Sequence, residues 1–71
     1  MKTIKIAIRG MQDLNDEEAV KEALYDVWGV NQVEVSWSES KARLRYDESA
    51  ASEVDFEQAI IDQGFEVGEE G

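Results

Sequence analysis

Apolar side chains follow two alternating spacings along this chain, and their order limits the fold more than any other feature. Between Lys2 and Arg9, isoleucines occupy every second position (Ile4, Ile6 and Ile8), which is the period of a half-buried strand. The same period recurs in residues 33–37 and 42–46, on either side of a Ser-Glu-Ser turn, and this predicts a β-hairpin. Phe65 and Val67 predict a short last strand.

A segment with helical spacing lies between the first strand and the hairpin. Asp13, Asn15 and Asp16 are suitable N-cap residues, because such side chains accept hydrogen bonds from the first turn. Asn15 also stands three residues before Glu18, the spacing of a capping box. Gly29 is expected to end the helix as a left-handed cap. The apolar positions of this helix are Val20, Ala23, Leu24, Val27 and Trp28.

A second helical segment follows the hairpin. Ser52 is its expected N-cap, and the helix should end before Gly64. Its predicted inner face consists of Phe56, Ala59 and Ile60.

The order of elements is therefore βαββαβ, and a weak internal repeat divides it into two halves. Residues 22–26 (Glu-Ala-Leu-Tyr-Asp) are echoed by residues 58–62 (Gln-Ala-Ile-Ile-Asp). Right-handed crossovers place both helices on one face of a four-stranded antiparallel sheet, the ferredoxin-like sandwich of the α+β class. We assign this single domain to residues 1–67 and an acidic C-terminal tail to residues 68–71.

The absence of cysteine and histidine limits the chemistry. It excludes disulfides, thiolates and imidazole bases, and leaves the thioethers of Met1 and Met11 as the remaining soft metal ligands. Paired carboxylates can act as acid and base, but the sequence contains no nucleophile with a base partner and no glycine-rich phosphate loop. A core this small also leaves no substrate pocket, so the chain is predicted not to be an enzyme.

The formal net charge of −10 limits the partners. It would repel phosphate backbones and anionic lipids, so we expect neither nucleic acid nor a membrane surface as a partner. The apolar stretches are too short to cross a bilayer, and the N-terminal alternation differs from a signal peptide. A cytoplasmic monomer is expected.

Five of the seven basic residues share one parity on the predicted first and third strands, namely Lys5, Arg9, Lys41, Arg43 and Arg45. Because these strands are neighbours in a ferredoxin-like sheet, the open sheet face should be basic, tempered by Glu34, and the helix face acidic. Such a face is most often a solvated surface, and the alternative is a docking site for an acidic partner or for another copy's helices. The outward positions carry no aromatic residues of the kind that stack on RNA bases.

Several scaffold segments together resemble the heavy-metal-associated (HMA) domain of copper chaperones and metal-transporting ATPases. They are Gly10-Met11, Ala23-Leu24, Gly29-Val30, Val33-Glu34-Val35, Tyr46-Asp47, Ala59-Ile60 and Gly64-Phe65. The resemblance covers nearly the whole chain. It implies a metallochaperone-type binding module whose partner is a metal-transport ATPase domain or another copy. It also implies that Met11 packs beneath the loop and that Phe65 lies beside it.

The family signature, Gly-Met-x-Cys-x-x-Cys, is altered here. Residues 10–16 read Gly-Met-Gln-Asp-Leu-Asn-Asp, so Asp13 and Asp16 occupy the two ligand positions. Copper(I) prefers sulfur ligands, whereas carboxylates suit magnesium, calcium or manganese. The resemblance therefore implies loss of the soft-metal site. Asp13, Asp16 and Glu17 are the candidate ligands of, at most, a weakly bound divalent hard cation, and no other cofactor is expected.

Two interpretations of these residues stay open. In the first, the acidic loop keeps a metal-linked function, or the domain pairs with a transport ATPase. In the second, the carboxylates only cap the helix and complement its dipole, and the scaffold serves as a protein-interaction or regulatory domain without metal. Trp28 and Trp37 are expected in the core or at its rim.

Overall fold

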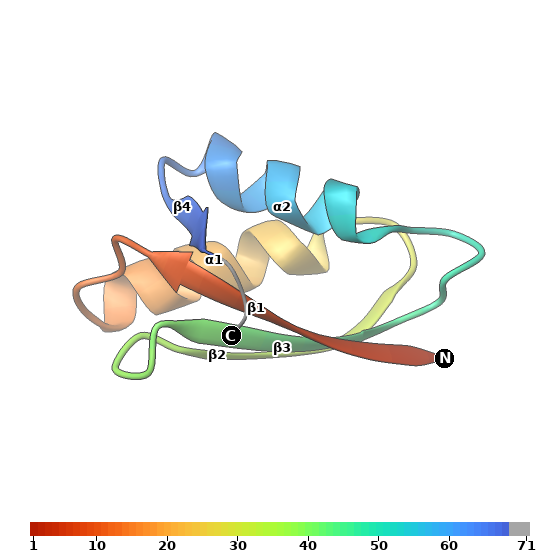
Figure 1. The fold of residues 1–71 in the computed structure, drawn as a ribbon, viewed down its shortest axis with the longest axis horizontal. Helices are drawn as coiled ribbons and strands as arrows, with labels where there is room; N and C mark the ends of the chain where they lie inside the picture. The colour runs from red at the N-terminus through yellow and green to blue at the C-terminus, as the bar shows by residue number, and fades with distance from the viewer. Residues whose placement is uncertain (69–71) are drawn as a thin grey trace.

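The structure is a computed structural model that describes residues 1–68. Its elements are β1 (Lys2–Arg9), α1 (Leu14–Tyr25), β2 (Val30–Ser36), β3 (Lys41–Tyr46), α2 (Glu53–Asp62) and β4 (Glu66–Gly68), as Figure 1 shows. β4 extends one residue past the predicted domain boundary at residue 67, and the rest of the predicted tail, residues 69–71, lies outside the described residues.

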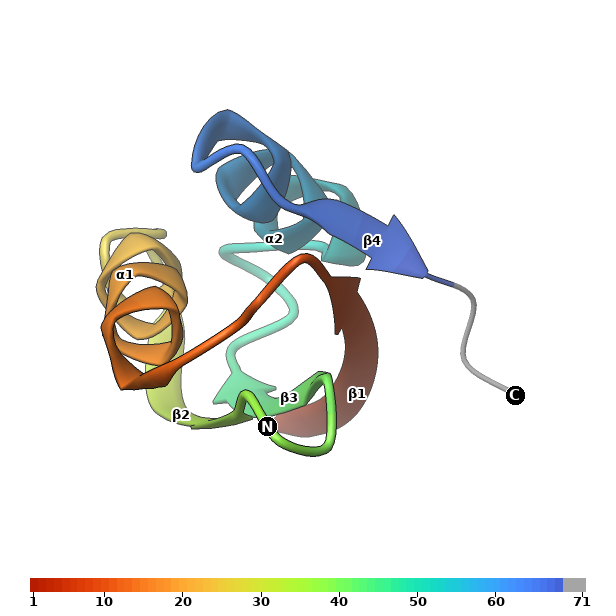
Figure 2. The same cartoon turned by 90° about the vertical axis from the view of Figure 1, so that its left-hand side faces the viewer.

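The sheet has the strand order β2-β3-β1-β4, and each pair of neighbours is antiparallel. Both helices cover one face of the sheet, which curves beneath them, and the other face is left open (Figure 2). This confirms the ferredoxin-like βαββαβ prediction. No helix within residues 1–68 is long and apolar enough to cross a membrane.

The core lies between the sheet and the two helices. Its largest fully buried side chains come from both layers, and they are Ile8, Val20, Leu24, Leu44, Phe56 and Ile60. The ring of Tyr46 on β3 meets the ring of Phe56 edge-on, with centroids 4.7 Å apart, which joins α2 to the middle of the sheet. The predicted inner faces of strands and helices are therefore confirmed except at Trp28 and at Trp37, which is 38% exposed and lies at the rim.

The end of α1 differs from the prediction. The helix ends at Tyr25, and tight turns follow, in which Val27 N–H donates to Leu24 and Val30 N–H donates to Val27. Gly29 does adopt a positive φ of 95°, but it belongs to this turn. Trp28 is consequently carried off the helix face and is 83% exposed, so its expected place in the core or rim was wrong.

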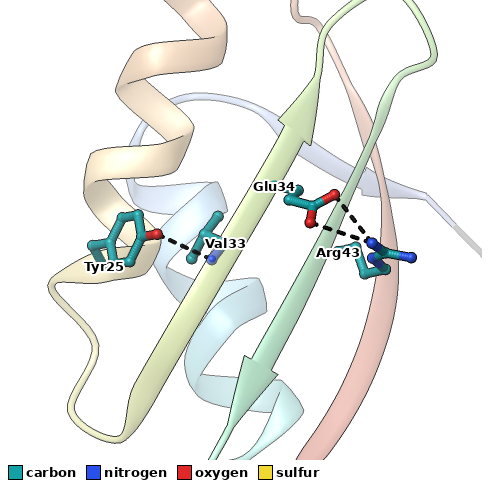
Figure 3. A network of polar contacts seen from close by, with 4 residues as sticks. All are labelled: Tyr25, Val33, Glu34 and Arg43. Carbon is teal, nitrogen blue, oxygen red and sulfur yellow. Dashed lines mark hydrogen bonds and ion pairs between the residues drawn. The ribbon is translucent and has the colours of Figure 1, made fainter.

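α1 also protects an edge of the sheet. β2 is an edge strand, so some of its backbone N–H groups have no neighbouring strand to donate to. The Tyr25 hydroxyl accepts a hydrogen bond from the N–H of Val33 at 3.3 Å (Figure 3). A side chain of the helix thus satisfies an edge amide of the sheet.

Candidate functional site

The loop that matches the family's metal loop joins β1 to α1 and lies at the same end of the molecule as the β2–β3 turn (Figure 1). Gly10 has a φ of 107°, and a Cβ at this position would lie 3.3 Å from the ring of Phe65. Met11 is 8% exposed and belongs to the core, while Phe65 packs half-buried against the same core. The packing implied for these two residues is confirmed.

Asp13 and Asp16 hold the start of α1. Asp13 is the N-cap, and its Oδ1 accepts a hydrogen bond from the N–H of Asp16 at 3.1 Å. Asp16 Oδ2 in turn accepts from the N–H of Gln12 at 2.8 Å. Asp13 therefore stabilises an N–H group that the helix start leaves without a partner, and Asp16 ties the helix to the loop residue before the cap.

The cap is thus Asp13, and the capping-box spacing noted at Asn15 and Glu18 is not the one that forms. Both of those residues lie inside α1. The bond that forms runs from the N–H of Asp16 to the carboxylate of Asp13, which are also three residues apart, so the acidic residue at each end of this spacing was the sequence signal for the pair. What the spacing does not reveal is that Asp16 bonds Gln12, one residue before the cap.

Glu17 lies in the first turn of α1, half-buried beside Asp16. Within residues 1–68, no three acidic, cysteine or histidine side chains are grouped so that they could hold a metal ion. Each aspartate has one oxygen in a capping bond, and calcium takes six to eight oxygens. The cation site at Asp13, Asp16 and Glu17 therefore stays a prediction, with few protein oxygens to build it from.

The open face of the sheet carries the second candidate surface. We call Lys5, Lys41, Arg43 and Arg45 the basic face, because all four are exposed while the intervening residues of β3 are buried. Lys5 stands directly opposite Arg43 in the β1–β3 register. The predicted basic surface is therefore present on adjacent strands.

Two carboxylates temper this surface. Glu34 on β2 pairs with Arg43, whose Nη2 lies 3.1 and 3.2 Å from the two carboxylate oxygens (Figure 3). Arg9, the fifth predicted member, stands opposite Glu66 on β4, and its guanidinium lies over Gly68. We therefore leave Arg9 out of the basic face.

Comparisons with known proteins agree with this geometry. A scan against protein-family models found no match. The copper chaperone CopZ of Staphylococcus haemolyticus (strain JCSC1435) is 36% identical over 62 residues, which cover 87% of this chain and 91% of the chaperone.

Solved structures give the same answer. A copper binding domain from HMA7, a P-type ATPase, superposes with a TM-score of 0.93 at 29% identity, covering 96% of this chain and 92% of that domain. A CopZ metallochaperone superposes with a TM-score of 0.92 at 27% identity, covering 94% of this chain and all of that one (100%).

The fold and the altered loop define a small α+β domain of metallochaperone type. The chain belongs to the heavy-metal-associated domain family of the copper chaperones, with Asp13 and Asp16 in place of the two cysteines.

Proposed function

We propose that this chain is a non-enzymatic binding module of the HMA family that does not carry copper(I) and acts through protein contacts. The proposal rests mainly on the residues at the family's two ligand positions, Asp13 and Asp16. Both hold carboxylates, and each accepts a capping hydrogen bond from the backbone of its own loop. Thiolates are the ligands that copper(I) prefers, and the chain contains none.

The partner we propose is another protein domain in the cytoplasm, either a metal-transport ATPase domain or a further copy of this chain. The relatives include a copper chaperone and a copper binding domain of a P-type ATPase, and they support the first choice. The basic face supports protein contact in general, because it offers charged side chains on an otherwise acidic molecule.

A copper(I) titration against a competing chelator tests the proposal. The chain should bind no more copper(I) than an acidic protein of another fold. The double variant Asp13→Cys, Asp16→Cys is the matched comparison, because it restores the family spacing on the same scaffold and should gain one copper(I) ion. Tight binding of one copper(I) ion by the unaltered chain would refute the proposal.

At the same loop we propose, at most, weak binding of a hard cation. Amide shifts of the ¹⁵N-labelled chain during titration with calcium, magnesium and manganese measure it. Saturable shifts confined to residues 11–18 support a metal-linked role. Their absence up to millimolar cation supports the alternative, a protein-interaction domain that keeps the scaffold without metal.

A further inference from the structure

The basic face places like charges where a sheet would ordinarily avoid them. Lys5 and Arg43 are direct cross-strand neighbours, and like charges in this arrangement are destabilising. Glu34 stands opposite Arg43 from the other side, so the row across β2, β3 and β1 carries one carboxylate and two cations. After Glu34 pairs with Arg43, the positive charge of Lys5 remains unneutralised within this row.

The rows on either side carry a cation with neutral neighbours. Arg45 stands between Gln32 and Thr3, and Lys41 stands between Ser36 and Ala7. Within residues 1–68, the ion pair of Arg43 with Glu34 is the only one, so Lys5, Lys41 and Arg45 have no carboxylate within 4 Å. Three cations of this face are therefore available to a ligand.

Short side chains beside the cations leave the face hollowed. One shallow hollow of about 320 Å³ is bordered by the cations Lys5, Lys41 and Arg43 and by the carboxylates Glu34 and Glu39. A second, of about 350 Å³, is bordered by Thr3, Gln32, Arg43 and Arg45. Arg43 and its partner Glu34 border both hollows. Cations outnumber carboxylates by three to two in the first hollow and by two to one in the second, so both carry a net positive charge.

The spacing of the charges indicates the shape of the ligand. Alternate residues of a strand lie about 6.8 Å apart, so Lys41, Arg43 and Arg45 form a row of cations with this period. An extended peptide repeats its side chains at the same distance. We infer that the basic face binds an extended acidic protein segment with carboxylates at alternate residues, laid along β3.

This inference rests on the proposed protein-contact function and names its surface and partner class. Single-stranded RNA fits less well, because the outward positions paired across β1, β2 and β3 carry no aromatic side chain for base stacking. The net charge of −10 also opposes a polyanion longer than the face itself. A short acidic segment is attracted by the basic face and is too short to be repelled strongly by the acidic remainder of the molecule.

The test uses the ¹⁵N-labelled full chain and a blocked peptide of alternating glutamate and threonine, matched to the six residues of β3. Amide shifts should move along β1 and β3 at low salt and shrink as salt screens the pairs. A peptide of the same composition with its glutamates grouped together should bind more weakly. Equal binding of both peptides would remove the spacing argument and overturn the inference.

Matched variants locate the contact. The double variant Lys41→Gln, Arg45→Gln should weaken binding by about fivefold, the loss expected from two exposed ion pairs. The variant Lys2→Gln, Lys21→Gln removes the same charge away from the face and should bind as the unaltered chain does. Equal weakening in both variants would mean that the peptide is attracted by charge in general and not bound at the basic face, and this would overturn the inference.

Other occupants would appear in the same experiment. Shifts on both the sheet face and the helices that grow with protein concentration, without peptide, would identify a second copy and overturn the inference. Tighter binding of a uridine oligonucleotide than of the peptide would do the same. Copper(I) binding is read at residues 11–18 and peptide binding at β1 and β3, so the failure of one proposal is distinguishable from the failure of the other.

Discussion

At the scale of single residues, Asp13 and Asp16 lie where the family has its two metal ligands, but their side chains have a different chemistry. Both carboxylates lie at the start of α1, where N–H groups and the helix dipole favour negative charge. A thiolate would be favoured there for the same electrostatic reason. An aspartate adds a short acceptor that bonds the backbone directly, so here these positions stabilise the helix itself.

Replacing Asp13 with alanine removes the N-cap of α1. We expect the free energy of unfolding to fall by about 1 kcal/mol, within the usual range for lost caps. Asp26→Ala is the control, because it removes the same charge from the other end of the helix, where a negative charge opposes the dipole. Urea unfolding of both variants measures the difference, and equal losses would contradict the capping role.

Asp47 supplies a prediction for pH. The Ser49 hydroxyl donates to its Oδ1 at 2.7 Å, and the Ser49 N–H donates at 3.0 Å. These bonds lower the pKa of Asp47 below its ordinary value of 3.8, chiefly through the hydroxyl. Because the folded-state pKa is the lower one, the stabilisation is present above pH 3.8 and is lost as the pH falls through the folded-state value.

The variant Asp47→Asn should therefore be less stable than the unaltered chain at neutral pH, since a neutral acceptor bonds Ser49 more weakly. The difference should close in acid below the folded-state pKa. Glu48→Gln changes the same charge one residue away and should show a smaller difference at neutral pH. Denaturation at a series of pH values checks this, and a gap that widened in acid would count against it.

At the scale of elements, periodicity was enough for the number, type and order of strands and helices. It also predicted most buried positions, such as Ile6, Leu24 and Phe56, but it placed the exposed Trp28 inside and missed the buried Ala51. The end of α1 was not predictable in this way. Val27 and Trp28 continue the helical spacing, but the chain leaves the helix at Tyr25 to reach β2. A spacing pattern cannot show where a tight turn begins.

The two turn glycines after the helices offer a comparison at this scale. Gly29 has a φ of 95°, and a Cβ there would lie 2.8 Å from the Cβ of Ala50, whereas at Gly64, with a φ of 92°, nothing lies within 4 Å. Gly64→Ala should cost about 1–2 kcal/mol from backbone strain. Gly29→Ala should cost more, because the contact with Ala50 adds to the strain. Thermal unfolding compares them, and equal losses would show that the contact relaxes freely.

At the scale of the whole molecule, charge is divided between the two layers. Both helices begin with acidic residues, Asp16 and Glu17 in α1 and Glu53 and Asp55 in α2, and neither has a basic residue in its last turn. The basic face lies on the far side of the sheet. The sequence predicted this division from strand parity, but not the opposition of Lys5 and Arg43 or the hollows, which depend on register.

This division predicts how salt acts on stability. The net charge of −10 makes the folded chain repel itself, and salt screens that repulsion, so the melting temperature should rise between about 10 mM and about 150 mM sodium chloride. Two neighbouring exposed residues of α1 test the cause. Glu22→Gln should reduce the salt effect and Lys21→Gln should increase it. A shift in the same direction for both would point to an effect other than net charge.

The bond from Val33 to the Tyr25 hydroxyl limits what kind of partner the β2 edge of the sheet can accept. Many domains capture a peptide by letting it continue the sheet at an open edge, which reads the peptide's backbone and tolerates varied sequences. At Val33 that backbone position is already filled from within the molecule. A partner that meets this sheet at its face is recognised by its side chains, so single charge changes in the partner should matter more than its ability to form a strand.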